Sequence, residues 1–161
     1  MRFAIRPADI DETPLTGEAP ANYVRRLSIE KADASMTSPL ASPAEILLAA
    51  DTTVDVNGEI LEKPLDADDA YRMLRMLSGR SHRVHTGVTV SVPITGARRS
   101  STIVVTTEVT FADLQDAAID WYLETGEAMD KAGAYGIQGA AGAFVEKING
   151  SVTNVIGLPL A

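Results

Sequence analysis

The stretch from Leu47 to Pro64, LLAADTTVDVNGEILEKP, constrains the fold more than any other part of the chain. The unbroken apolar run over 46–50 is typical of a strand buried on both faces, and Asp51 follows it directly, so we expect this carboxylate at a strand end. The residues after it are mostly β-branched, and Asn57-Gly58 is a strong signal for a two-residue turn that leads back to Lys63. The stretch therefore predicts a hairpin with a carboxylate on one arm and an ammonium group on the other.

This pair of charges suits phosphoryl chemistry. A carboxylate can bind a divalent cation or accept a proton from water, and a lysine can neutralise phosphate oxygens. Charged residues beside a turn are more often simply solvated, and the stretch by itself favours that simpler interpretation.

The composition narrows the class of protein. A chain of 161 residues fits one domain, 1–161. The absence of a long apolar run and of a signal-peptide pattern predicts a cytoplasmic protein outside the membrane. The absence of cysteine excludes disulfides and thiolate sites, so any metal is expected to have oxygen ligands, as Mg²⁺ or Mn²⁺ does. The net charge of -8 argues against binding to duplex nucleic acid but permits binding of a mononucleotide.

The remaining pattern predicts alternating strands and helices. Helix signals include Pro20 near a first position, with Lys31 near the end of that helix, and Asp66 as an N-cap. Two long stretches rich in Val and Thr predict paired antiparallel strands. The predicted elements are a strand at 2–6, a helix from 20, a connector at 35–43, a helix at 66–79, strands at 81–93 and 100–111, a helix at 113–125, and a closing hairpin formed by 143–147 and 152–156.

Two further features bear on a site. Glycines recur every third residue from Gly133 to Gly142, which predicts either a flexible loop or a segment that approaches a ligand closely and offers its amides to phosphates or to a base. His82 and His85 are three residues apart on a strand, so they lie on opposite faces and are interpreted as structural.

Several enzyme classes are disfavoured. The phosphate-binding motif GxxxxGK[ST] and the dinucleotide motif GxGxxG are both missing, and neither histidine lies near a serine nucleophile motif. Asp51 and Asp55 leave open a metal phosphatase of another class, although their spacing matches no known motif.

Three blocks, in order, carry a resemblance to a known family: ADTTVDVNGEILEKP, AYRMLRMLSGRSHRVHTGVTV and GEAMDKAGAYGIQGAAGAFVEKINGSVTNVIGLPL. Together they resemble the Maf family of nucleotide pyrophosphatases. The resemblance implies an elongated α/β domain with a mixed sheet, flanking helices and a cleft between two lobes, as in inosine triphosphate pyrophosphatase. It also implies cleavage of a nucleoside triphosphate between the α and β phosphates with Mg²⁺ or Mn²⁺, in a protein that forms homodimers.

The resemblance assigns roles to particular residues. Asp51 matches the proposed catalytic base, and Glu12 matches an acid that would assist Asp51 at the metal. Lys31, Lys63 and Lys131 match positions that face the triphosphate or its surroundings.

Two further positions match residues associated with the choice of substrate, Thr52 and Gln138. The block DKAGAYGIQG is similar to the branch acting on dTTP and UTP. A glutamine amide offers both a donor and an acceptor, which is what reading the edge of a pyrimidine requires.

Members of the family usually begin with a strand and a loop of the type SASPRR, and they continue beyond GLPL with a helix. Neither segment is in this sequence, so the chain is expected to be a fragment, a sequence with a mis-assigned start, or a paralogue shortened at both ends. The arginine of that loop would contact phosphate, a contribution of about 1.5–3 kcal/mol. Two functions are therefore expected: an active dTTP/UTP pyrophosphatase, or a catalytically weak or inactive nucleotide-binding regulator of cell division.

Overall fold

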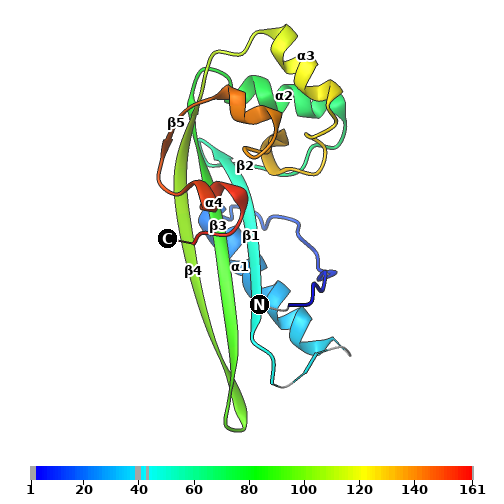
Figure 1. The fold of residues 1–161 in the computed structure, drawn as a ribbon, viewed down its shortest axis with the longest axis vertical. Coiled ribbons are helices and arrows are strands. Elements are labelled where there is room, and N and C mark those ends of the chain that lie inside the picture. Colours follow the sequence, from blue (N-terminus) through cyan, green and yellow to red (C-terminus); the bar gives the residue numbers. More distant parts are fainter. Residues whose placement is uncertain (1–2, 39–40, 43, 161) are drawn as a thin grey trace.

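The computed structural model describes residues 3–38, 41–42 and 44–160. It is elongated, with one five-stranded sheet and helices on both of its faces (Figure 1). The strand order is β2-β1-β3-β4-β5, and all pairings among the described strands are antiparallel. The α/β class with flanking helices is confirmed. The strands are β1 (Leu47–Val56), β2 (Glu59–Leu61), β3 (Ser81–Ile94), β4 (Ala97–Phe111) and β5 (Val145–Asn149). The helices are α1 (Pro20–Thr37), α2 (Ala67–Leu77), α3 (Asp116–Glu124), α4 (Val152–Ile156) and two short 3₁₀ helices, η1 (Ala132–Ala134) and η2 (Ala140–Phe144).

The predicted hairpin forms, but Asp51 does not end a strand. Asn57 and Gly58 both have positive φ, as a tight hairpin turn requires, and Val56 pairs with Glu59 across it. Asp51 lies in the middle of β1, opposite Gly87 of β3, because the β-branched residues after it continue the strand. The start of β1 is also not buried on both faces, since Leu48 is 57% exposed.

The long hairpin and the helix capped by Asp66 are confirmed. β3 and β4 pair along their whole length, and β4 begins three residues earlier than predicted. The Asp66 side chain accepts a hydrogen bond from the Asp69 amide at 2.8 Å. Helix α1 continues to Thr37, so the predicted connector at 35–43 starts later than expected, and part of it lies outside the described residues.

Two hydrophobic clusters lie on opposite faces of the sheet. The main core packs α2, α3 and the two 3₁₀ helices against alternate residues of the strands, including Val54 and Val84. Helix α1 covers the other face (Figure 1), where its main chain at Val24 lies so close to β3 that a Cβ at Gly87 would be 2.2 Å from the Val24 oxygen. Because side chains alternate along a strand, neighbouring residues of β1 face these two different layers.

Both histidines are buried, and they lie on opposite faces of the sheet as predicted. His82 is 2% exposed, contacts the rings of Phe111 and Tyr135, and shares a 2.8 Å hydrogen bond with the Tyr135 hydroxyl. His85 shares a 3.1 Å contact with Asp55 on the α1 face.

The structure corrects two predictions near the ends of the sequence. Arg2 lies outside the described residues, and no strand forms over 3–6, where Phe3 and Ile5 are each 82% exposed and gain no burial that would hold an extended segment. The second arm of the closing hairpin is helix α4, because the Ser151 side chain caps the Asn154 amide and a helical turn follows. None of the helices in the described ranges has the length and apolar character that crossing a bilayer requires.

Candidate active site

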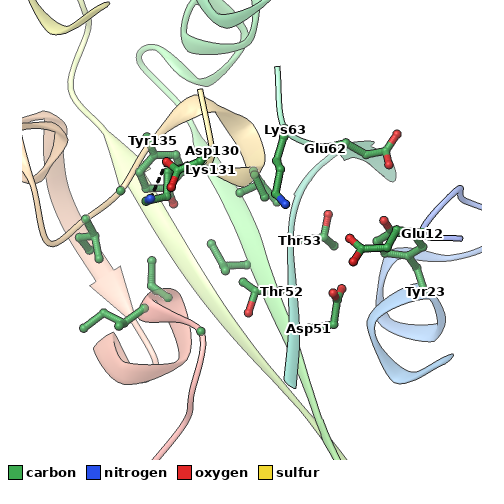
Figure 2. Close-up of a pocket in the computed structure, with 18 of the residues that line it drawn as sticks. Glu12, Tyr23, Asp51, Thr52, Thr53, Glu62, Lys63, Asp130, Lys131 and Tyr135 are labelled. Atoms are coloured by element: carbon green, nitrogen blue, oxygen red, sulfur yellow. Dashed lines mark hydrogen bonds and ion pairs between the residues drawn. The ribbon is translucent and has the colours of Figure 1, made fainter. Parts of the chain in front are cut away.

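A pocket of about 410 Å³ opens beside the middle of β1 (Figure 2). Its walls come from the loop before α1, from α1 itself, from β1, from the segment after β2, from the loop around η1 and from α4. All seven residues assigned a role from the sequence line this pocket: Glu12, Lys31, Asp51, Thr52, Lys63, Lys131 and Gln138.

The pocket reaches both faces of the sheet because β1 is the edge strand at this point. Strand β2 pairs only with Val54, Asp55 and Val56, so the preceding part of β1 has no β2 partner in the described structure. Asp51 and Thr52 are adjacent and point to opposite sides of β1 in Figure 2. The α1 face therefore contributes Asp51 to the pocket, and the α4 face contributes Thr52.

Lys31 joins two carboxylates at the α1 side of the pocket. Its Nζ atom lies 2.6 Å from Asp51 Oδ1 and 2.8 Å from Glu12 Oε1. The three residues come from β1, from α1 and from the loop before α1, so only the packing of α1 on the sheet brings them together. Asp51 is 9% exposed, which makes this a largely buried charge cluster.

Burial and charge act in opposite directions on this cluster. Burial raises the pKa of Asp51 and outweighs the hydrogen bond and positive charge of Lys31, which lower it. For Lys31, burial disfavours the ammonium form, but the hydrogen bonds to Asp51 and Glu12 outweigh it, and the pKa of Lys31 is raised. The directions agree with the geometry: Asp51 is the more buried member and shares its one close cation with a second carboxylate. Asp51 is thus a stronger base than an exposed aspartate.

The other two lysines enter from different segments. Lys63 follows β2 and directs its ammonium group into the pocket on the β1 side (Figure 2). Lys131 lies across the pocket, where its Nζ atom is 2.6 Å from Asp130 Oδ1. Lys131 is 44% exposed in its side chain, so it contributes charge at the rim.

The glycine-spaced segment reaches the pocket, but its amides have partners within the protein. The amides of Gly133, Gly139 and Gly142 donate to main-chain oxygens at 3.0–3.1 Å, and that of Gly136 lies 3.4 Å from the Tyr122 hydroxyl. The predicted row of amides offered to phosphates is therefore wrong. Close packing explains two of the glycines: a Cβ at Gly133 would lie 2.9 Å from the Val54 side chain, and one at Gly139 would lie 2.0 Å from a carboxylate oxygen of Glu127.

Asp55 does not belong to this site. Its carboxylate accepts a hydrogen bond from the Gly58 amide at 2.6 Å and lies 3.1 Å from the His85 ring nitrogen, so Asp55 stabilises the hairpin turn and the sheet. Among the described residues, no group of three or more His, Cys, Asp or Glu side chains is placed to hold a metal ion. The structure therefore does not support the alternative of a metal phosphatase of another class that uses Asp51 and Asp55 together.

Two residues on the acidic side of the pocket, Tyr23 and Glu62, were not predicted from the sequence. Tyr23 is 4% exposed, and its pKa is raised by burial and then by the negative charges of Glu62, Asp51 and Glu12. The sequence did contain a signal for Tyr23. It lies eight residues before Lys31, which is two intervals of four, so both residues are on the same face of the predicted helix. Glu62 directly precedes Lys63 in the EKP block, so the same motif contains it.

Comparison with known proteins decides the family. The model of the family described as Maf-like protein matches residues 1–161. The chain is a member of the Maf family. A protein of Anaeromyxobacter dehalogenans (strain 2CP-C), named dTTP/UTP pyrophosphatase, is 55% identical over 161 residues, which is 100% of this chain and 79% of the relative.

Two more relatives with the same name give similar values. The protein of Myxococcus xanthus (strain DK1622) is 48% identical over 160 residues, 99% of this chain and 78% of the relative. The protein of Shewanella oneidensis is 50% identical over 154 residues, 94% of this chain and 76% of the relative. The Maf resemblance seen in the three sequence blocks is therefore confirmed.

Proposed function

We propose that this Maf protein hydrolyses dTTP and UTP to the nucleoside monophosphate and pyrophosphate, with Mg²⁺ or Mn²⁺. The observation that carries the proposal is the convergence of Asp51, Glu12 and Lys31 within 2.8 Å contacts in a pocket that Lys63 and Gln138 also line. Relatives that are 48–55% identical to this chain over the aligned residues and are named dTTP/UTP pyrophosphatase support the same substrates.

In the proposed reaction Asp51 takes a proton from water as the water oxygen bonds to the α-phosphorus. The bond from that phosphorus to the bridging oxygen breaks, and pyrophosphate leaves with the electron pair. Burial makes Asp51 more basic, while the hydrogen bond from Lys31 favours its ionised form, so it is suited to accept a proton from water. Lys63 and Lys131 would offset the charge of the departing pyrophosphate.

The pocket fits a divalent cation that arrives with the nucleotide. Four carboxylates and three ammonium groups line it, so it carries one negative charge more than positive and does not by itself balance a triphosphate. Glu12 and Asp51 both lie close to one cation, the ammonium group of Lys31. A pair of carboxylates together with substrate phosphates is a common set of ligands for Mg²⁺. When bound, the metal would neutralise phosphate charge and make the α-phosphorus more electrophilic.

Recognition of the base is assigned to Thr52 and Gln138, which line the pocket together with apolar residues of α4, Val155 and Ile156. The amide of Gln138 can both donate to and accept from a pyrimidine edge.

Measurement of pyrophosphate release tests the proposal. We expect release from dTTP and UTP with Mg²⁺, and a loss of 10²- to 10⁴-fold in kcat for Asp51→Asn, the size of a general-base contribution. Asp55→Asn is the matched control, because Asp55 is a buried aspartate on the same strand outside the pocket, and we expect its activity to stay within a few-fold. Folded protein without pyrophosphate release, or equal activity of Asp51→Asn and the unmodified chain, overturns the proposal.

A catalytically inactive regulator predicts thermal stabilisation by dTTP with no product, and no observation in the described structure favours it. Homodimer formation and a cytoplasmic location remain predictions, as does a single domain over 1–161. Sedimentation velocity with the purified protein tests the first of these.

A further inference from the structure

A chain of hydrogen bonds starts at Thr52 and leads away from the pocket. Thr52 Oγ1 lies 2.9 Å from Thr86 Oγ1 on the neighbouring strand β3. Thr86 Oγ1 in turn donates to the main-chain oxygen of Asn154 in α4, also at 2.9 Å. Thr86 and Asn154 are both 0% exposed, so water does not compete for the bond between them.

The order of donors along this chain is fixed by chemistry. A carbonyl oxygen only accepts, so the single hydroxyl hydrogen of Thr86 is committed to Asn154. The contact between the two hydroxyls can then form only if Thr52 donates and Thr86 accepts. The hydrogen of Thr52 is thereby directed away from the pocket, and its oxygen offers lone pairs alone to a ligand.

The carbonyl that sets this order is itself held in place. The Asn154 side-chain amide donates to the main-chain oxygen of Val84 and to Thr107 Oγ1, both at 3.0 Å. These bonds fix α4 against β3 and β4, and the orientation of the Asn154 carbonyl follows from them.

The oxygen of Thr52 remains accessible on its pocket side. Gly157 follows α4 and lines the same pocket, and a Cβ at that position would approach Thr52 Oγ1 to 3.4 Å. Gly157 has a φ of 111°, a conformation that favours glycine, so its missing side chain leaves room beside Thr52.

We propose that Thr86 is a positioning residue that makes Thr52 a pure acceptor and thereby favours uracil and thymine over cytosine. This inference rests on the proposed function. Uracil and thymine present a ring N–H between two carbonyls, whereas cytosine has a lone pair at the same ring nitrogen. A hydroxyl oxygen that can only accept forms a hydrogen bond with the ring N–H of uracil or thymine, but its lone pair is repelled by the lone pair of the cytosine ring nitrogen.

The decisive measurement is the ratio of dissociation constants for CTP and UTP with Mg²⁺, by calorimetry in an Asp51→Asn background where turnover does not interfere. We expect Thr86→Val, which has nearly the same volume and no hydroxyl, to reduce this ratio by about tenfold, because the Thr52 hydroxyl can then rotate and donate. The Asn154 carbonyl keeps the Gly157 amide as a partner at 2.9 Å, so the substitution leaves it bonded.

Two variants separate positioning from general structural damage. Thr86→Ser keeps the hydroxyl, and we expect it to retain the discrimination. Thr89→Val is the matched control, because Thr89 is a buried threonine on the same strand whose partners, Ser28 and Thr102, lie outside the pocket. Should Thr86→Val not fold, Thr86→Cys gives the same comparison, since a thiol of similar size is a weak acceptor.

A double-mutant cycle tests whether Thr86 acts through Thr52. In a Thr52→Val background, Thr86→Val is expected to leave the ratio unchanged, because Thr86 acts through Thr52. An unchanged ratio in Thr86→Val, an equal fall in Thr89→Val, or no preference for UTP in the starting protein overturns the inference. If nucleotides bind with the predicted preference but the unmodified chain releases no pyrophosphate, the proposed function alone fails; if pyrophosphate forms but Thr86→Val keeps its preference, the inference alone fails.

Discussion

Lys31 is the residue on which the charge balance of the site depends. Its ammonium group is the close partner of both Asp51 and Glu12, and the burial of Asp51 leaves little water to replace it. A helix that ends on a lysine needs no functional explanation, because the helix dipole alone favours it. Here the lysine lies well inside α1 and is paired across to β1, so the dipole is not what determines its position.

Lys31→Met is expected to move the acidic limb of the kcat/KM pH profile to higher pH. Removing the cation leaves Asp51 with burial and the carboxylate of Glu12, which raise its pKa, opposed only by the weaker effect of the Lys63 charge, so the pKa of Asp51 rises further. We expect a shift of about one pH unit or more and a lower maximum. Lys147→Met, at an exposed position on β5, is the control and should leave the profile in place. An unshifted limb in Lys31→Met would contradict the role given to this pair.

His82 makes folding stability depend on pH. Burial lowers the pKa of His82 to about 4, from an ordinary value of 6.5. The folded state therefore binds the proton less well than the unfolded state, so this contribution is fully present above pH 6.5 and is lost as the pH falls toward 4. The full loss is about 3 kcal/mol, at 1.36 kcal/mol for each unit of pKa.

Urea unfolding at pH 7.5 and at pH 4.5 measures this effect. His82→Gln keeps a hydrogen-bonding group near Tyr135 without titrating, so the stability difference between the two pH values should be about 2–3 kcal/mol smaller than in the unmodified chain. Equal differences in both proteins would show that another group carries the pH dependence.

Helix α1 and strand β3 form the contact that places Lys31. Gly87 lies opposite Asp51 in the register of β1 and β3, and the α1 main chain passes directly over it. The glycine thus lets α1 lie at the distance at which the lysine of the helix reaches the aspartate of the strand. The sequence pattern TGVT gave no indication of this role, since an isolated glycine in a strand only indicates some close backbone approach.

Gly87→Ala tests that contact. A Cβ 2.2 Å from the Val24 oxygen must push the helix away, and we expect a loss of about 1–3 kcal/mol in free energy of unfolding together with reduced activity as Lys31 moves from Asp51. Gly58→Ala is the comparison: its φ of 89° is strained for alanine but nothing lies within 4 Å, so stability should fall by about 1–2 kcal/mol and activity should not change. Normal activity in a folded Gly87→Ala protein would contradict the argument.

At the scale of the whole molecule, the pocket lies where the two hydrophobic clusters meet the edge of the sheet. The α1 layer supplies one wall, and the loop around η1, which packs in the main core, supplies another. A nucleotide that fills this pocket would contact both layers, and its binding free energy would then add to the stability of their association. The overall charge of -8 and the excess carboxylate in the pocket predict that this binding depends on a cation.

Thermal unfolding of Asp51→Asn with dTTP checks this coupling without turnover. At a nucleotide concentration of 100 times the dissociation constant, binding contributes about 2.7 kcal/mol, and the melting temperature should rise by about 5–10 °C. The shift should require Mg²⁺ and disappear with EDTA. Lys63→Met should reduce it. A shift of equal size in EDTA would contradict the need for a divalent cation.

The sequence by itself determined the elements whose signals are local. Asn57-Gly58 specified a turn through its positive φ angles, Asp66 specified a helix start through its cap, and two runs rich in Val and Thr specified the long hairpin. The family resemblance also predicted which side chains would gather, and all seven line one pocket.

Only the tertiary structure decided how those side chains act on one another. Asp51 is in mid-strand because β3 pairs beyond it, and Thr52 is oriented by a threonine and a carbonyl 34 and 102 residues later in the chain. The second arm predicted at 152–156 became a helix, which supplies that carbonyl. Burial, shared hydrogen bonds and the direction of a hydroxyl proton arise from contacts between distant segments, so no local pattern in the sequence contains them.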